Sequence, residues 1–258
     1  MNMIGVQGYT VRDYMADKAQ FAETLTKLRK IGYTCIDHGI PQGMTASEFK
    51  QFLIDHDIKP LKVGSDVATL LKDKTQVIKD AHELGVDVVT ILTIPLDMRG
   101  NEDGYKKFAT DANQVAKDLK NEGLRTAYHH HAIEFQSFGG YNGMDIFINE
   151  AEDLDFILDT HWIAAAGVNP SDFIRRLKGR CPFIHFKDYG IDAPDVNKVE
   201  QVPRIYCEVG QGNLDWVSIA QACMDTGVNT VVVEQDICKV NPFTSLEISY
   251  KAIKNLGF

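Results

Sequence analysis

Residues 183–188 read Phe183-Ile184-His185-Phe186-Lys187-Asp188, a short apolar run that ends in ionisable side chains. Three further segments, residues 124–134, 156–162 and 230–236, pass in the same way from apolar residues to His, Asp or Glu. Continuous apolar runs of this length are typical of strands buried on both faces of a parallel sheet. The pattern therefore predicts four buried strands with polar side chains at their carboxyl ends.

Four more apolar runs precede these, and segments with helical periodicity, such as Phe21, Leu25 and Leu28, lie between the runs. The eight predicted strands are residues 4–6, 33–36, 61–63, 88–92, 124–128, 156–158, 183–186 and 230–233. Strands that alternate with helices pair in parallel through right-handed crossovers, and eight such units close most simply as a (β/α)₈ barrel. The 258 residues match the roughly 250 typical of this architecture, so we expect one domain spanning residues 1–258.

Residues typical of helix starts support this division into strands and helices. Thr45 with Glu48, and Thr244 with Glu247, have the spacing of a capping box, and residues 169–170 (Asn-Pro) predict another helix start. A doubly wound open sheet is the alternative, but residues 5–10 lack the GxGxxG spacing common after its first strand. The longest connection, residues 188–213, is predicted to be a loop over the active face.

Charge and composition limit the classes of partner that the protein is expected to bind. The formal net charge is -9, without the basic stripe that phosphate binding requires, which argues against a nucleic-acid partner. No apolar stretch resembles a secretion signal or a membrane span, and the five cysteines contain no CxxC pair. We therefore expect a cytoplasmic protein with reduced thiols, a small-molecule ligand and no membrane partner; a homo-oligomer is left open.

Candidate metal ligands stand at the predicted strand ends, because the carboxyl ends of barrel strands face one shared cavity. Glu134, Asp159, His185 and Glu234 supply three carboxylates and one imidazole, a set that suits Mn²⁺, Mg²⁺, Co²⁺ or Zn²⁺. Carboxylates so crowded would repel one another without a cation. Taken singly, an acid at a strand end is more often a helix cap or part of a loop salt bridge, and it is the joint placement of the four on successive strands that favours a metal site.

The triple histidine, residues 129–131, adds candidates for proton transfer. Successive strand residues face opposite sides, so His130 should point away from whatever His129 and His131 approach. A histidine titrates near neutral pH, which makes His129 a candidate general base, with a role in supporting a ligand as the alternative.

Three other residues are candidates for contact with a substrate. Lys187 shares the strand face of His185 and could stabilise a developing oxyanion or form a salt bridge to Asp188 or Glu208. Trp162 could line a sugar-binding wall or belong to the core. Glu208 lies in a glycine-containing loop where the backbone can approach a ligand closely.

Motifs along nearly the whole chain resemble the sugar phosphate isomerase/epimerase family, also called xylose-isomerase-like barrels. The motifs are residues 7–13, 128–135, LDTHW at 158–162, HFKD at 185–188, EVGQGNLDW at 208–216 and EQD at 234–236. The resemblance implies a divalent metal on Glu134, Asp159, His185 and Glu234, and isomerisation or epimerisation of a carbohydrate through an enediolate. The expected catalytic residues are then His129, Glu134, Lys187 and Glu234, with Tyr9, His131, Trp162, Lys187 and Glu208 against the substrate.

Some positions depart from that family's pattern. His129 stands where many ketose epimerases have a glutamate, Asp37 where a glutamate is common, and Asp66 where a histidine is frequent. The YHHH form is closer to inosose dehydratases and to subunits that deglycosylate 3-keto C-glycosides, in which β-elimination comes after proton removal. A lyase is therefore the first alternative; an abasic-site endonuclease, disfavoured by the charge, and a non-catalytic sugar-binding barrel are the others.

Overall fold

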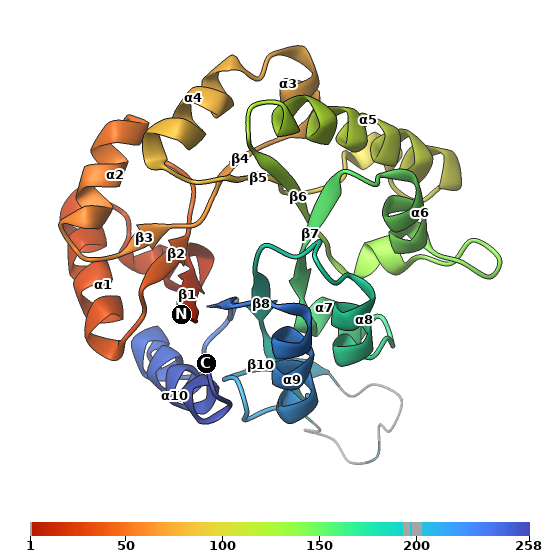
Figure 1. Cartoon of the computed structure of the whole chain (residues 1–258). Coiled ribbons are helices and arrows are strands. Elements are labelled where there is room, and N and C mark those ends of the chain that lie inside the picture. The colour runs from red at the N-terminus through yellow and green to blue at the C-terminus, as the bar shows by residue number, and fades with distance from the viewer. Residues whose placement is uncertain (1, 193–196, 198–202) are drawn as a thin grey trace.

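The computed structural model describes residues 2–192, 197 and 203–258 and shows a parallel barrel inside a ring of helices (Figure 1). The barrel strands are β1 (Met3–Gln7), β2 (Cys35–Asp37), β3 (Lys59–Pro60), β4 (Val63–Ser65), β5 (Val88–Ile91), β6 (Arg125–His129), β7 (Leu154–Asp159), β8 (Ile184–Phe186) and β11 (Thr230–Val233). The strand order is β3-β2-β1-β11-β8-β7-β6-β5-β4, and neighbouring strands in this order pair in parallel.

The third barrel strand closes the sheet. The two ends of the strand order, β3 and β4, are separated in sequence only by Leu61 and Lys62. β3 pairs with β2 and β4 pairs with β5, so one interrupted strand joins both edges. The predicted (β/α)₈ barrel is confirmed, and the run predicted at residues 61–63 is the middle of this interrupted strand.

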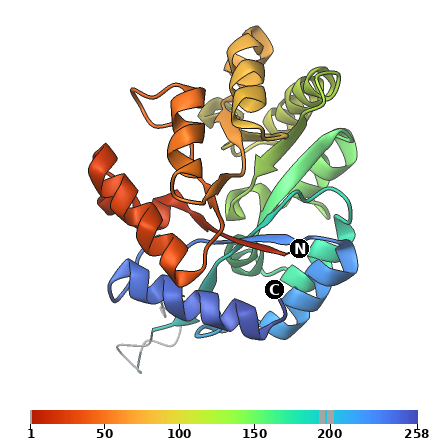
Figure 2. The same cartoon turned by 60° about the vertical axis from the view of Figure 1, so that its left-hand side comes forward.

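The helices cover the outer face of the barrel. They are α1 (Lys18–Ile31), α2 (Ala46–Ile54), α3 (Val67–Lys72), α4 (Thr75–Leu84), α5 (Glu102–Lys120), α6 (Gly143–Glu150), α7 (Thr160–Ala165), α8 (Pro170–Arg176), α9 (Trp216–Thr226) and α10 (Pro242–Asn255). Short 3-10 helices span Gly8–Tyr14, Leu96–Met98 and Ala132–Phe135. The first and last helices, α1 and α10, are in contact, which completes the ring (Figure 2). In the described part of the chain, none of the helices has the length and apolar character needed to cross a bilayer.

Two of the three predicted helix starts are correct. Thr45 and Glu48 form a reciprocal capping box, and Asn169 caps α8 with Pro170 in its first turn. The box predicted at Thr244 is wrong, because α10 begins earlier: Asn241 caps it by accepting the N–H of Phe243 at 3.0 Å. Pro242 explains the difference, since proline fits the first turn of a helix, where its missing N–H is not needed.

The connection after β8 contains a β-hairpin. Strands β9 (Asp188–Ile191) and β10 (Arg204–Cys207) pair antiparallel, with Asp188 opposite Cys207. The predicted loop at residues 188–213 is therefore partly an ordered ribbon beside the end of β8. Residues 193–196 and 198–202 of that prediction lie outside the described part of the chain.

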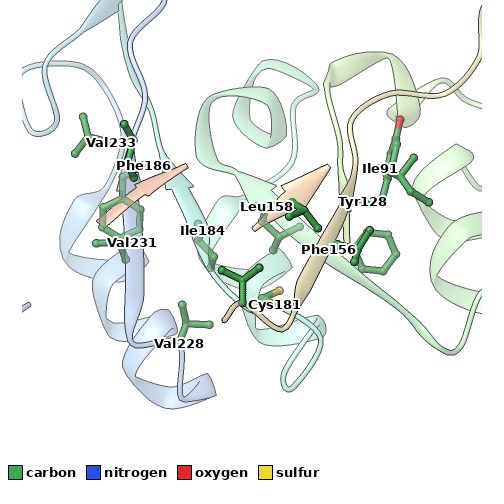
Figure 3. Close-up of a cluster of buried hydrophobic side chains, with 14 of the residues drawn as sticks. Ile91, Tyr128, Phe156, Leu158, Cys181, Ile184, Phe186, Val228, Val231 and Val233 are labelled. Carbon is green, nitrogen blue, oxygen red and sulfur yellow. The ribbon is translucent and has the colours of Figure 1, made fainter. Parts of the chain in front are cut away.

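Strand alternation divides the core into two apolar layers. Side chains such as Tyr128, Phe156 and Leu158 lie between the barrel and its helices (Figure 3). Inside the barrel a smaller cluster is formed by Val88, Ala127, Ile157, Phe183 and Val232. The inner cluster closes the barrel floor, and strand alternation places the residues two positions further along each strand directly above it.

Candidate metal centre

Four ionisable side chains stand directly above the inner apolar cluster, each two residues beyond one of its members. His129 follows Ala127, Asp159 follows Ile157, His185 follows Phe183, and Glu234 follows Val232. Because residues i and i+2 of a strand share a face, the alternation that buries the floor also turns these four groups inward.

The four side chains form a candidate metal-binding group. Each offers one ligand atom, and these atoms all lie within 4.8 Å of one another. Each also has a buried polar atom without a hydrogen-bond partner in the described structure: His129 Nε2, Asp159 Oδ2, His185 Nδ1 and Glu234 Oε2. His185 Nδ1 and Glu234 Oε2 are 2.6 Å apart but are not aligned for a hydrogen bond. Buried polar atoms are normally paired, so converging unpaired donors and acceptors fit a cation that would complete them.

The charge around the group also fits a cation. Asp37, Asp159, Glu234 and Asp236 carry four negative charges, and only Lys62 and Lys187 oppose them directly among the described residues. With neutral imidazoles this leaves a formal charge of about −2, which one divalent ion balances.

The protonation of His185 and Asp159 reflects the same excess of negative charge around the group. Burial alone would lower the pKa of His185, but Glu234 and Asp37 raise it to about 10. Burial raises the pKa of Asp159. Without a cation, the group therefore retains protons that neutralise part of its negative charge.

Asp37 and Lys62 hold His185 in place from behind. His185 Nε2 lies 2.9 Å from Asp37 Oδ2, and Lys62 Nζ lies 3.3 Å from Asp37 Oδ1. Burial would raise the pKa of Asp37, but Lys62 and His185 hold it well below its usual value. A carboxylate on one ring nitrogen leaves the other, Nδ1, directed at the metal group. From the sequence, Asp37 was named only as a departure from the family pattern and Lys62 was not identified; the position of Lys62 between Leu61 and Val63 in the predicted strand was the available signal.

Glu134 lies apart from the group in which it was expected. Its Oε1 accepts the hydroxyl of Tyr128 at 2.6 Å and its Oε2 accepts the N–H of His131 at 2.7 Å. Tyr128 belongs to the outer apolar layer, so this carboxylate lies on the helix side of the barrel. His129 and Glu134 are five residues apart, so strand alternation alone would place them on opposite faces, and the chain turns into the 3-10 helix Ala132–Phe135 soon after β6 ends at His129. His129 is the residue that β6 contributes.

The other two histidines of the run have different surroundings. His130 is buried on the opposite face, as predicted, and its Nε2 accepts the N–H of Asp159 at 3.1 Å. Burial lowers the pKa of His130 to about 3, so the ring is neutral. His131 lies beside the group, with its ring 5.0 Å from that of His129 and 5.6 Å from that of Trp162. Burial lowers the pKa of His131 as well.

Lys187 is a buried ammonium at the edge of the group. Its Nζ lies 2.8 Å from Glu234 Oε1, 2.9 Å from Asp236 Oδ2 and 4.0 Å from Asp159 Oδ2. Burial alone would lower the pKa of Lys187, but these three carboxylates raise it above its usual value. The alternative partner considered from sequence, Asp188, instead accepts the N–H groups of two loop glycines and the indole of Trp216. Asp236 comes two residues after Glu234, and this spacing was the signal by which it could have been found.

Tyr9 and Glu208 lie farther from the group. Tyr9 is 53% exposed, and the centre of its ring lies 4.0 Å from the guanidinium carbon of Arg12. The guanidinium N–H of Arg12 donates to the backbone carbonyl of Asp236 at 3.0 Å. This places Tyr9 on the rim of the barrel mouth. Glu208 accepts the hydroxyl of Ser245 in α10 at 2.6 Å, so its carboxylate holds a loop to a helix.

The fold and the group at its mouth define a (β/α)₈ barrel with a candidate metal centre at the carboxyl ends of its strands. The chain belongs to the xylose isomerase-like TIM barrel family, whose model matches residues 25–242. No match to a curated protein sequence was found.

Solved structures share the fold at low sequence identity. A sugar phosphate isomerase/epimerase from Parabacteroides distasonis ATCC 8503 is 18% identical with a TM-score of 0.80, over 98% of this chain and 93% of that one. A probable 3-DHS dehydratase, AsbF from Bacillus anthracis, is 13% identical with a TM-score of 0.73, over 99% of both chains. The IOLI protein, solved with a bound zinc atom, is 16% identical with a TM-score of 0.71, over 99% of this chain and 98% of that one.

Proposed function

We propose that the protein is a divalent-metal-dependent isomerase or epimerase that removes a proton next to the carbonyl of a sugar or keto-sugar. The observation that carries the proposal is the convergence of four strand-end ligands, each with a buried unpaired atom, at the mouth of the barrel. A structural salt-bridge network accounts for the 2.6 Å contact between His185 and Glu234, but not for the unpaired His129 Nε2 and Asp159 Oδ2 beside it.

The ligands of the proposed ion are His129, Asp159, His185 and Glu234. Two imidazole nitrogens and two carboxylates favour Mn²⁺, Co²⁺ or Zn²⁺ over Mg²⁺, which prefers oxygen ligands. When bound, such an ion supplies Lewis-acid polarisation of the substrate carbonyl.

His131 takes the role of general base in this proposal. His129, considered for that role from the sequence, belongs to the ligand group, whereas His131 is a neutral imidazole beside it. A neutral ring within reach of the substrate can accept the α-proton and return it. Lys187 remains an ammonium and stabilises the negative charge that develops on the substrate oxygen.

Proton exchange tests this assignment. In D₂O with Mn²⁺, the protein should exchange the α-proton of at least one ketose or keto-sugar of a panel, and removal of the metal should abolish the exchange. His131→Gln should slow exchange by about a hundredfold or more while full metal content is retained. Unchanged exchange in this variant would exclude His131 as the base.

The lyase alternative shares the first step, and a dehydratase is among the proteins of the same fold. The two reactions diverge only after the α-proton has been removed. Deuterium incorporation with the carbon skeleton intact supports isomerisation or epimerisation, whereas release of water or of an aglycone supports elimination.

A further inference from the structure

A cavity of about 250 Å³ lies beside the candidate metal group. Its walls are His161 and Trp162 from α7, and Arg204, Ile205 and Tyr206 from β10. Lys187 Nζ lies 5.1 Å from the ring centroid of Trp162 and 5.2 Å from that of Tyr206. The same ammonium is 2.8 Å from Glu234, so two wall residues of the cavity and the metal group share Lys187 as a neighbour.

Three rings dominate the walls. The His161 ring lies 4.6 Å from that of Trp162 and 5.2 Å from that of Tyr206. Flat π faces of this kind pack against the face or edge of another ring. Ile205 adds an aliphatic surface, so the cavity suits a ring-shaped group better than a compact ion.

Polar atoms without partners stand among these rings. His161 is only 3% exposed, yet in the described structure its Nδ1 has no hydrogen-bond partner, and neither has Nε1 of Trp162. Leaving a buried polar group unpaired costs about 1–3 kcal/mol, so such groups usually mark a missing partner. The indole N–H can only donate, and so can the guanidinium of Arg204. The partner must therefore carry an acceptor oxygen.

We propose that this cavity is a substrate subsite for a second six-membered ring, bearing an acceptor oxygen and attached to the sugar unit that reacts at the metal group. The inference rests on the proposed function and specifies its substrate class as a keto-sugar glycoside, which carries its carbonyl on the sugar ring and a second ring as its substituent. The volume is just below the roughly 300–1,000 Å³ typical of sites for whole drug-sized ligands, which fits one ring of a larger substrate. The second ring is either a sugar or an aryl group.

Calorimetric binding with matched ligands tests the subsite. The ligands are methyl glycosides of glucose, galactose, xylose and arabinose in their 3-keto forms, each compared with its nitrophenyl glycoside and with a disaccharide of the same 3-keto sugar. For at least one sugar, the ring-bearing ligand should bind about tenfold tighter than the methyl glycoside. Preference for the nitrophenyl glycoside identifies an aryl subsite, and preference for the disaccharide a sugar subsite.

Two variants with a matched control locate the effect. Ile205→Trp fills the cavity and should reduce the preference to within about twofold, whereas Ile54→Trp, at an exposed position at the end of α2, should retain it. His161→Phe keeps a ring but removes the nitrogens, and should weaken the ring-bearing ligand while the methyl glycoside is unaffected. Circular dichroism shows whether each variant is folded.

The outcomes separate the subsite from the proposed function. A protein that binds Mn²⁺ but shows no preference for any ring-bearing ligand, or whose preference survives in folded Ile205→Trp, overturns the subsite alone. A preference that disappears in Ile205→Trp, in a protein that binds no divalent metal, supports the subsite and overturns the metal-dependent function.

Discussion

At the scale of single residues, strand periodicity decides which acids and histidines meet. Asp159, His185 and Glu234 lie on the inner face because each follows an inner apolar residue by two positions. On β6 the same rule selects His129, whereas Glu134 lies beyond the strand and reaches back to Tyr128 and His131. The strand-end position and the family resemblance favoured the glutamate in the sequence analysis, whereas backbone geometry favours the histidine.

Substitution of the two glutamates distinguishes these positions. Glu234→Gln removes a proposed ligand charge and should lower metal affinity at least about tenfold. Glu134→Gln should keep full metal content but lose about 1–3 kcal/mol of unfolding free energy, because a buried hydrogen-bonded carboxylate is replaced. Metal analysis and urea denaturation measure the two effects. Loss of metal from Glu134→Gln, with Glu234→Gln unaffected, would reverse the assignment.

The raised pKa of His185 predicts how pH affects metal binding. In the metal-free protein its pKa is about 10, above the unperturbed value, so this group stabilises the fold below about pH 6.5 and loses that contribution as pH rises toward 10. A metal ligand must be deprotonated, so binding between these limits displaces a proton.

Metal affinity should therefore rise about tenfold per pH unit between pH 7 and 9 if one proton is released. Calorimetry in buffers of different ionisation enthalpy counts the released protons directly. Affinity that stays constant over this range, with no proton released, would mean that His185 is already neutral without metal.

At the scale of elements, the connection after β8 is organised by one carboxylate. Asp188 accepts the N–H groups of Gly210 and Gly212 at 3.0 Å and the indole N–H of Trp216 at 2.6 Å. A side chain at Gly212 would approach Asp188 Oδ1 and the carbonyl of Tyr189 within 2.3 Å, so glycine is required there. These contacts join the hairpin to the start of α9 and position the wall that carries Tyr206.

Asp188→Asn should destabilise the protein by about 1.5–3 kcal/mol, because an amide cannot accept as many charged hydrogen bonds and brings its own donors into the cluster. Asp192→Asn, at an exposed position just beyond the same hairpin strand, is the matched control and should change stability by less than about 0.5 kcal/mol. Denaturant midpoints compare the two. Equal stability of both variants would show that the connection does not depend on this carboxylate.

At the scale of the whole molecule, four strands that are distant in sequence bring their side chains to one buried site with an excess of negative charge. The four proposed ligands lie between His129 and Glu234, and Asp37 and Lys62 contribute charge from the first half of the chain. A cation that binds all of these strands together stabilises the barrel as a unit, since it binds only the folded arrangement.

Metal removal should therefore lower the melting temperature. At a free metal concentration about a hundred times the Kd, the expected stabilisation is about 2.7 kcal/mol, which corresponds to roughly 5–10 °C for a chain of this size. Scanning calorimetry with Mn²⁺ and with a chelator measures the shift, and Glu234→Gln should reduce it. A melting temperature independent of the metal would contradict the proposed centre.

The local sequence was sufficient to predict the strands, the polar residues at their ends and the barrel, because short apolar runs and helical periodicity are patterns between residues close in sequence. It also separated His130 from its neighbours, since alternation acts within one strand. The helix start at Asn241 was missed because two capping patterns lie within one turn and only the proline decides between them.

The ligand set and its supports were decided by the tertiary structure. Residues 128–134 were interpreted as one strand end, and only the structure shows that β6 ends at His129 and that Glu134 turns back to Tyr128. The pairing of Asp37 with Lys62 and His185, and of Lys187 with Asp236, joins residues from separate strands. The sequence by itself determined a parallel barrel with charged residues at its strand ends. Closure of the barrel determined which of these charged residues share one buried space, because the grouping depends on distances between strands rather than on spacing along one strand.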